Sequence, residues 1–358
     1  MESRAALGAF ALAIGWRWAA AVGEGGNMSG SKLWTFLIAT VLGASAGGGA
    51  GSAAAQPAAT DFPSRTLRIL VGFAPGGGTD ITARIVAKRL AEQIRQQVVV
   101  ENRAGGGGVV AMELLAAAAP DGYTILLGAV GPFAVTPHMQ KVSYDVERDY
   151  APLTMGVVFP NVVVVHPGVP VRSLADYLAL ARSDGARLSY GSSGIGSAGH
   201  LAGELLNAMA GTAIPHIAYK GGGPAMTDLL GGQIPSVMAS LPSALPHIRT
   251  GRILALATTG AVRARDLPMT PTVAESGHAG YDAVNWYAFV APAKTPMAIR
   301  ARLTEALVAT LKSSDVVEQL HGHGMEPKPD GPDALAATMR RETAVWAKVV
   351  KDAGLAAR

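Results

Sequence analysis

Three short turns rich in glycine and other small residues carry groups that could bind a small anion. They span residues 74–80, 191–200 and 219–225, each between an apolar run typical of a strand and a pattern typical of a helix. Backbone N–H groups at a helix N-terminus attract anions, and glycine lets a ligand approach the backbone. Together the turns predict a site for an anion, with a carboxylate favoured. Taken singly, each turn has the alternative interpretation of a tight turn without a ligand.

The second turn also matches a dinucleotide-binding pattern. Residues 194–199 read GIGSAG, which fits G-x-G-x-x-G between a predicted strand and helix. An acidic residue is expected about 20 positions further on to bind the ribose. The corresponding region reads HIAYKGGG, in which Lys220 is the only charged residue. A dinucleotide-dependent enzyme is therefore the less favoured alternative.

Other catalytic and metal-binding patterns are weak. A G-x-S-x-G match at 43–47 lies in a segment that we expect to be removed. His321 and His323 flank a glycine in a predicted flexible break, without a third metal ligand nearby in sequence. We therefore predict no catalytic residue, no metal site and no cofactor.

Short apolar strands alternate with helical patterns along most of the chain. In the first half, strands are predicted at 67–73, 97–102 and 123–129, with helices from Thr79 and over 110–119. A second series begins with a helix capped by Ser173, with Asp176 three residues further on. It continues through strands at 187–194, 214–223, 234–240 and 253–260, with helices from Ala198 and Pro224 between them. Such alternation predicts parallel strands joined by crossover helices, in two α/β lobes.

The first 55 residues differ in composition from the rest. From Met28 the chain reads as a secretory signal peptide, with a basic start, an apolar stretch at 33–42 and a small-residue cleavage site ending at Ala55. A membrane anchor is the alternative, but the apolar stretch is shorter than the ~20 residues that a bilayer requires. Residues 1–27 are interpreted as an upstream extension, so either Met1 or Met28 is the initiator.

Composition limits the class of protein further. The 358 residues include no cysteine and carry a formal net charge of +4. An exported chain without thiols depends on its core rather than on disulfides, and a small, scattered positive charge does not indicate nucleic-acid binding. These features fit a periplasmic protein of ordinary size.

Several sequence blocks in a fixed order point to one known family. They include FAPGGGTD, ENRAGGGG, APDGYTILLG, LSYGSSGIGSAGH, AYKGGGPAMTDLL and NWYAFVAPAKTP. Together they resemble the Bug family, the solute-binding proteins of the tripartite tricarboxylate transporter type, over essentially everything after Phe62. The resemblance implies a type II periplasmic-binding-protein fold with a central cleft and two crossing strands.

The resemblance also implies boundaries for the two lobes. The first lobe combines residues 56–153 with residues 286–358, and the second lobe spans 154–285. The crossing strands are expected near 154–165 and 285–291. The two lobes are expected to close on a small ligand.

Site residues follow from the same resemblance. In Bug-like proteins the first glycine-rich turn holds a ligand carboxylate, a role that falls here to Phe73, Ala74, Gly76, Gly77, Thr79 and Asp80. The second lobe holds the far side of the ligand, a role that falls to Ser192, Ser193, Gly196, Ser197, His200, Lys220, Gly221, Gly222 and Ser240.

Four of these residues have other interpretations. Thr79 or Asp80 could cap the following helix, and Asp80 could order the turn or recognise an amine instead of meeting an anion. His200 could be a packed histidine. Lys220 could be solvated, although a cation beside a cleft is well placed to attract a carboxylate.

One departure from the family bears on specificity. The family often has an Asp-Asn pair before Leu-Pro-Ser, where this chain has Ala239 and Ser240. The alanine side chain cannot bind an amino group, so we expect a less polar pocket for an aliphatic or aromatic carboxylic acid. Trp286 and Tyr287 could add apolar surface, or could pack at the hinge.

The sequence thus predicts an exported binding protein rather than an enzyme. The expected ligand is a small organic carboxylate, and the expected partners are the subunits of a membrane permease, bound transiently by a monomer. A sensor protein that docks on a receptor kinase is the alternative, and sequence does not separate the two.

Overall fold

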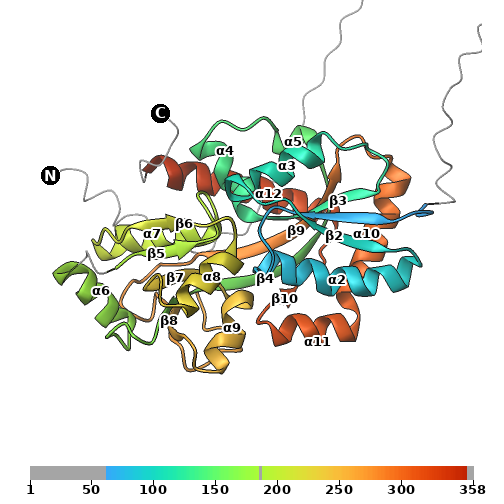
Figure 1. The fold of residues 1–358 in the computed structure, drawn as a ribbon. Helices are drawn as coiled ribbons and strands as arrows, with labels where there is room; N and C mark the ends of the chain where they lie inside the picture. The colour runs from blue at the N-terminus through green and yellow to red at the C-terminus, as the bar shows by residue number, and fades with distance from the viewer. Residues whose placement is uncertain (1–61, 185–187, 353–358) are drawn as a thin grey trace, which may run out of the picture. The chain divides into compact units, whose positions relative to one another are not determined.

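The computed structural model describes residues 62–184 and 188–352 (Figure 1). The predicted upstream extension and signal peptide lie outside these ranges. Among the helices in the described ranges, none is long and apolar enough to cross a bilayer.

The first series of strands and helices has the predicted alternation. Strand β1 (Leu67–Val71) pairs in parallel with β2 (Val98–Asn102) and with β3 (Thr124–Ala129). Helices α2 (Gly78–Ile94) and α3 (Val109–Ala116) make the crossovers. All six residues of β3 are buried, as expected for a strand covered on both faces.

The second series is also parallel where predicted. Its elements are α6 (Leu174–Ser183), β5 (Tyr190–Ser192), α7 (Ala198–Ala210), β6 (His216–Ala218), α8 (Gly222–Leu230), β7 (Ser236–Ser240) and β8 (Leu254–Thr258). Strand β5 pairs in parallel with both β6 and β7. The predicted cap of α6 is present, since Ser173 and Asp176 form a reciprocal capping box.

Two long strands cross between the series. Strand β4 (Tyr150–Val165) pairs antiparallel with β9 (Val284–Pro292) over its first part, and with β7 and β8 over its last part. Strand β9 also pairs antiparallel with β3. The result is one mixed sheet in the order β2-β1-β3-β9-β4-β7-β5-β6 (Figure 1).

The C-terminal part is helical and packs on the first series. It contains α10 (Met297–Lys312), α11 (Ser314–Gly322), the short strand β10 (Glu326–Pro327) and α12 (Pro332–Asp352). Helices α10 and α11 contact α2. Helix α12 contacts β4 and the π-helical turn η4 (Gly131–Val135).

Several helices were not predicted. The short ones are η3 (Gly106–Gly108), η4, α4 (Thr136–Met139) and α5 (Val146–Asp149). The longer one is α9 (Leu241–Arg249), which contains Pro242 in its first turn and Pro246 inside. A proline in the first turn costs little because the N–H there has no partner within the helix.

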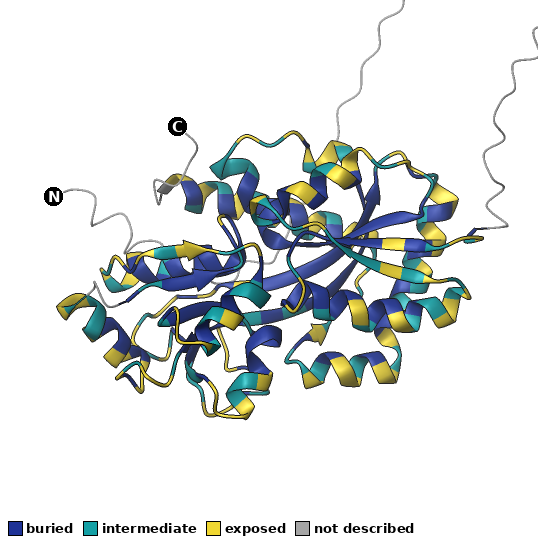
Figure 2. Cartoon of the chain, viewed as in Figure 1, coloured by how far each residue is buried: buried dark blue, intermediate teal, exposed yellow. Residues whose placement is uncertain are grey.

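The apolar core is divided in the same way as the sheet. Two clusters draw on residues before 160 and after 285, with only Ala198 and Leu201 added from α7. Two others draw on residues 162–283. The buried residues follow the central strands, and the exposed ones follow the outer faces of the helices (Figure 2). This two-lobed α/β arrangement with crossing strands is the predicted fold.

Candidate functional site

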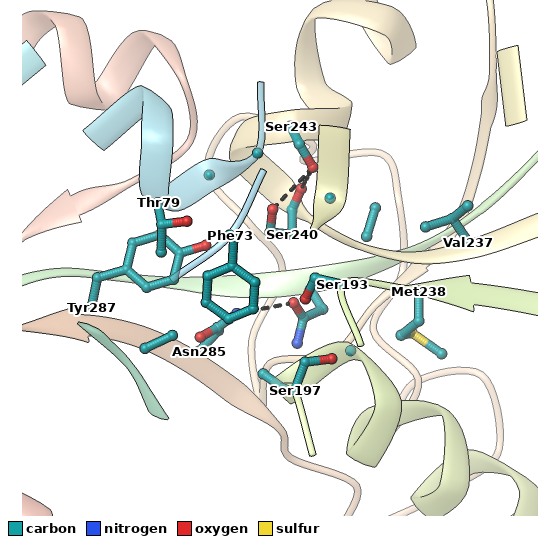
Figure 3. Close-up of a pocket in the computed structure, with 18 residues that line it drawn as sticks. Phe73, Thr79, Ser193, Ser197, Val237, Met238, Ser240, Ser243, Asn285 and Tyr287 are labelled. Carbon is teal, nitrogen blue, oxygen red and sulfur yellow. Dashed lines mark hydrogen bonds between the residues drawn. The ribbon is translucent and has the colours of Figure 1, made fainter. Parts of the chain in front are cut away.

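A cavity lies where the two series meet, and residues from both line it. The empty space between its walls, open solvent included, is about 530 Å³. Figure 3 shows side chains from β7, β9 and the glycine-rich turns around it. The lining residues are Phe73, Gly77, Gly78, Thr79, Ala129, Asn161, Ser193, Ser197, Ala198, Gly199, Gly222, Val237, Met238, Ala239, Ser240, Ser243, Asn285 and Tyr287.

The N-terminal ends of helices α2, α7, α8 and α9 all contribute to this lining. Gly78, Ala198 and Gly222 are the first residues of α2, α7 and α8, and Ser240 is the N-cap of α9. Each helix end carries roughly half a positive charge and free N–H groups. Among the described residues that line the cavity, none is Asp, Glu, Lys, Arg or His. Any positive potential that the described lining contributes therefore comes from backbone groups.

The β1–α2 turn is held by a buried carboxylate that does not line the cavity. Asp80 accepts hydrogen bonds from the Gly76 N–H at 3.0 Å, from Asn102 at 3.0 Å and from Arg84 at 2.9–3.0 Å. Burial alone raises the pKa of Asp80, but these hydrogen bonds and the Arg84 charge lower it overall. Asp80 therefore orders the turn. The N-cap of α2 is Gly77, so neither Thr79 nor Asp80 has the capping role that was considered for them.

The β5–α7 turn is held by uncharged groups instead. Ser192 Oγ lies 2.7 Å from His216 Nε2, and His200 Nδ1 accepts the Gly196 N–H at 3.2 Å. The Ser197 side chain caps α7 by accepting the His200 N–H. Burial lowers the pKa of His200, and burial together with the charge of His200 lowers the pKa of His216 to about 4. The two rings, 4.2 Å apart, are thus neutral near pH 7.

The β6–α8 turn meets the β1–α2 turn through the backbone. The Ala74 N–H donates to the Lys220 carbonyl at 2.9 Å. A Cβ on Gly223 would lie 2.1 Å from the Pro75 carbonyl oxygen, so only glycine allows this approach. The Lys220 side chain is exposed and does not line the cavity. The contact between these turns brings the two lobes together.

The crossing strands supply the polar floor of the cavity. Asn161 lies on β4 and Asn285 on β9, and the Asn285 Nδ2 donates to the Asn161 Oδ1 at 3.3 Å. Tyr287 Oη and Ser240 Oγ are hydrogen-bonded, and burial raises the pKa of Tyr287. Ser240 Oγ also lies 2.9 Å from Ser243 Oγ (Figure 3).

The structure separates the predicted site residues into two groups. Those that line the cavity are Phe73, Gly77, Thr79, Ser193, Ser197, Gly222 and Ser240. Those placed in the supporting turns, outside the lining, are Ala74, Gly76, Asp80, Ser192, Gly196, His200, Lys220 and Gly221. Of the two aromatic candidates, Tyr287 lines the cavity, whereas Trp286 stacks on Phe133 in the core.

The sequence prediction included Ser240, the N-cap of α9, but omitted Ser243 and the floor of the cavity. Ser243 was passed over because its segment did not read as a helix. Asn161 and Asn285 were treated only as parts of crossing strands. A lone amide in an otherwise apolar run, as in PNVVVV and VNWYAF, is the signal that could have identified them.

Comparison with known proteins identifies the family of this chain. A family model described as the tripartite tricarboxylate transporter family receptor matches residues 82–355. Protein BugT of Bordetella pertussis is 37% identical over 303 residues, which are 84% of this chain and 93% of BugT.

Two solved structures of similar proteins share the fold of this chain. An R. palustris protein solved with adipate has a TM-score of 0.80 and 36% identity, covering 83% of this chain and 99% of that protein. The periplasmic binding protein BugD has a TM-score of 0.80 and 32% identity, covering 83% of this chain and all of BugD.

The fold and the cavity define a two-lobed periplasmic binding protein of type II. The chain belongs to the tripartite tricarboxylate transporter family of receptors, which includes the Bug proteins. This is a family of binding proteins rather than enzymes.

Proposed function

We propose that this protein is exported to the periplasm and binds a small organic carboxylate there for delivery to a membrane permease. The observation that carries the proposal is the meeting of the α2, α7, α8 and α9 N-termini at one cavity without charged side chains. Backbone N–H groups in that arrangement stabilise a carboxylate. The relative solved with adipate supports the same ligand class.

The walls of the cavity favour a ligand with an apolar body. Phe73, Met238 and Ala239 line it, and the described lining offers no carboxylate to pair with an ammonium group. An amino acid would therefore leave its ammonium group without a charged partner, which is costly in a closed site. We propose an aliphatic or aromatic carboxylic acid as the ligand, rather than an amino acid.

The proposed lobes are residues 56–153 with 286–358, and residues 154–285. The division of the apolar core supports two such lobes, with two clusters on each side and the change between them on β4 between Phe159 and Val162. A ligand that touches both lobes favours the closed arrangement by as much as it binds that arrangement better. The closed monomer is the form that we propose the permease recognises.

Isothermal titration calorimetry tests the proposal. The purified protein, first unfolded and refolded to remove any retained ligand, is titrated with hexanoate, benzoate, adipate, aspartate and glutamate. We expect at least one non-amino carboxylate to bind with a dissociation constant in the micromolar range or below. Binding of aspartate or glutamate alone would contradict the ligand class, and binding of none of the five would contradict the proposed function.

A further inference from the structure

The amide pair on the cavity floor has hydrogen-bonding capacity that the protein does not use. Asn161 is 1% exposed and Asn285 is 6% exposed. Their single mutual hydrogen bond joins Asn285 Nδ2 to Asn161 Oδ1. In the described part of the chain, Asn161 Nδ2 and Asn285 Oδ1 have no hydrogen-bond partner. One donor and one acceptor thus remain unused, on two hydrogen-bonded residues that line the cavity.

This result does not depend on how the two amides are oriented. Oxygen and nitrogen of an Asn side chain are exchanged by a half-turn. If both amides are turned, Asn161 Nδ2 donates to Asn285 Oδ1, and one donor and one acceptor again remain free. If only one is turned, like atoms face each other and the mutual hydrogen bond is lost. Both bonded arrangements therefore present the same pair of groups.

Buried polar atoms without partners are uncommon in folded proteins, because their desolvation is not compensated. The backbone of Asn161 is fully engaged, since its N–H and carbonyl both bond to Thr259 Oγ1. These two hydrogen bonds hold the backbone from which the Asn161 side chain extends. A rigid, buried donor and acceptor at the floor of a binding cavity are the groups that a ligand can satisfy.

We propose that Asn161 and Asn285 together bind an uncharged group of the ligand that both accepts and donates a hydrogen bond, such as a carboxamide or a hydroxyl. The inference rests on the proposed function, since the ligand's carboxylate is held by the helix N-termini. An ammonium group only donates and a carboxylate only accepts, so either would leave one amide atom unpaired. The preferred ligand is then a monocarboxylate with an uncharged polar group at a distance from the carboxylate.

A matched set of six-carbon acids tests this inference by calorimetry. The set is hexanoate, 6-hydroxyhexanoate, adipate, 6-aminohexanoate and adipamate, the half-amide of adipate. Four-carbon counterparts, including butyrate and succinamate, cover a shorter cavity. We expect the half-amide or the hydroxy acid to bind at least about tenfold more tightly than the plain acid of the same length. Adipate and 6-aminohexanoate are expected to bind more weakly than whichever of the half-amide and the hydroxy acid binds more tightly.

A double variant tests whether the amide pair recognises the polar group of the ligand without destabilising the fold. Replacing both residues, Asn161→Leu with Asn285→Leu, removes the pair without leaving one member unpaired, a change that folded proteins tolerate well. We expect the preference for the polar acid over the plain acid to fall to within about twofold. Gln233→Leu is the matched control, because it replaces an exposed amide away from the cavity, and should keep the preference of the unmodified protein.

The outcomes distinguish the two proposals. Equal affinity for the plain and the polar acids overturns the role of the amide pair, while leaving the carboxylate proposal in place. The same holds if the double variant binds and keeps the full preference. If none of the acids binds the unmodified protein, both proposals are wrong. If the double variant does not fold, the titrations of the unmodified protein still show whether the polar acids are preferred over the plain acids.

Discussion

The two turns that face each other across the cavity are stabilised in different ways. The β1–α2 turn of the first lobe is ordered by the charged pair Asp80 and Arg84. The β5–α7 turn of the second lobe is ordered by the neutral rings of His200 and His216. In both cases these ordering groups lie behind the turn, outside the lining of the cavity. The comparison teaches that this protein keeps charge out of its site and uses it only to support the site.

The largest effect is expected when the charged support is removed. Asp80→Ala leaves the Gly76 N–H and Asn102 without their buried acceptor, which should lower the free energy of unfolding by about 2–3 kcal/mol. Carboxylate affinity should fall more than tenfold, because the turn is no longer fixed. Urea unfolding and calorimetry measure both effects. Arg89→Ala, which removes exposed ion pairs from the same helix to Glu92 and to Asp315, is the control and should change stability by less than 1 kcal/mol.

The pH dependence of stability distinguishes the two turns. The pKa of His216 is lowered to about 4, below the ~6.5 of an unfolded chain. The unfolded chain therefore takes up this proton first, and the contribution of His216 is complete above pH 6.5 and lost as the pH falls to about 4. The lowered pKa of Asp80 stabilises the folded chain at all pH values above its usual value of 3.8, and this contribution is lost only as the pH falls below that value.

We therefore expect His216→Gln to flatten the decline in stability between pH 6.5 and pH 4, by about 2 kcal/mol across that range. The decline below pH 4 should be unchanged. Urea unfolding at half-unit pH steps provides the measurement. A wild-type slope retained in the variant would show that the second turn is not supported by a neutral His216.

A carboxylate placed inside the cavity tests whether the exclusion of charge matters. Ala239→Asp adds a negative charge to the lining of the cavity that is proposed to bind a carboxylate. Repulsion should weaken binding of a simple carboxylate by about tenfold, while Ala239→Ser should weaken it by less than threefold. Unchanged binding by the aspartate variant would place the ligand elsewhere.

The smallest effect is expected where the two lobes touch. A methyl group on Gly223 would meet the Pro75 carbonyl oxygen at 2.1 Å, so Gly223→Ala should hinder closure and weaken binding by about fivefold. Gly322→Ala is a suitable control, because nothing lies within 4 Å of the added methyl group. Calorimetry compares the two variants. Equal affinities would mean that the turns need not approach as closely as they do here.

Local sequence patterns predicted most of the strands and helices, because alternating apolar runs and small-residue turns act over a few residues. They did not predict α9, since Pro242 and Pro246 read as helix breakers, although the first proline lies where a helix tolerates it. They also could not place Asn161 beside Asn285. That contact depends on the pairing of β4 with β9, two strands far apart in the sequence.

The roles of Asp80 and His200 show a further limit. Their positions at the starts of helices suggested a ligand site, and the sequence could not say which way each side chain points. Asp80 turns back to the Gly76 N–H, and His200 to the Gly196 N–H. Hydrogen bonds within a turn compete with a role in binding, and only the folded backbone decides between them.

A high-resolution crystal structure of the protein with a bound carboxylate tests the central claim most directly. The account predicts that the carboxylate oxygens accept hydrogen bonds from backbone N–H groups at two or more of the α2, α7, α8 and α9 N-termini. A ligand carboxylate paired with the side chain of Lys220 or of any arginine, or bound outside this cavity, would contradict it.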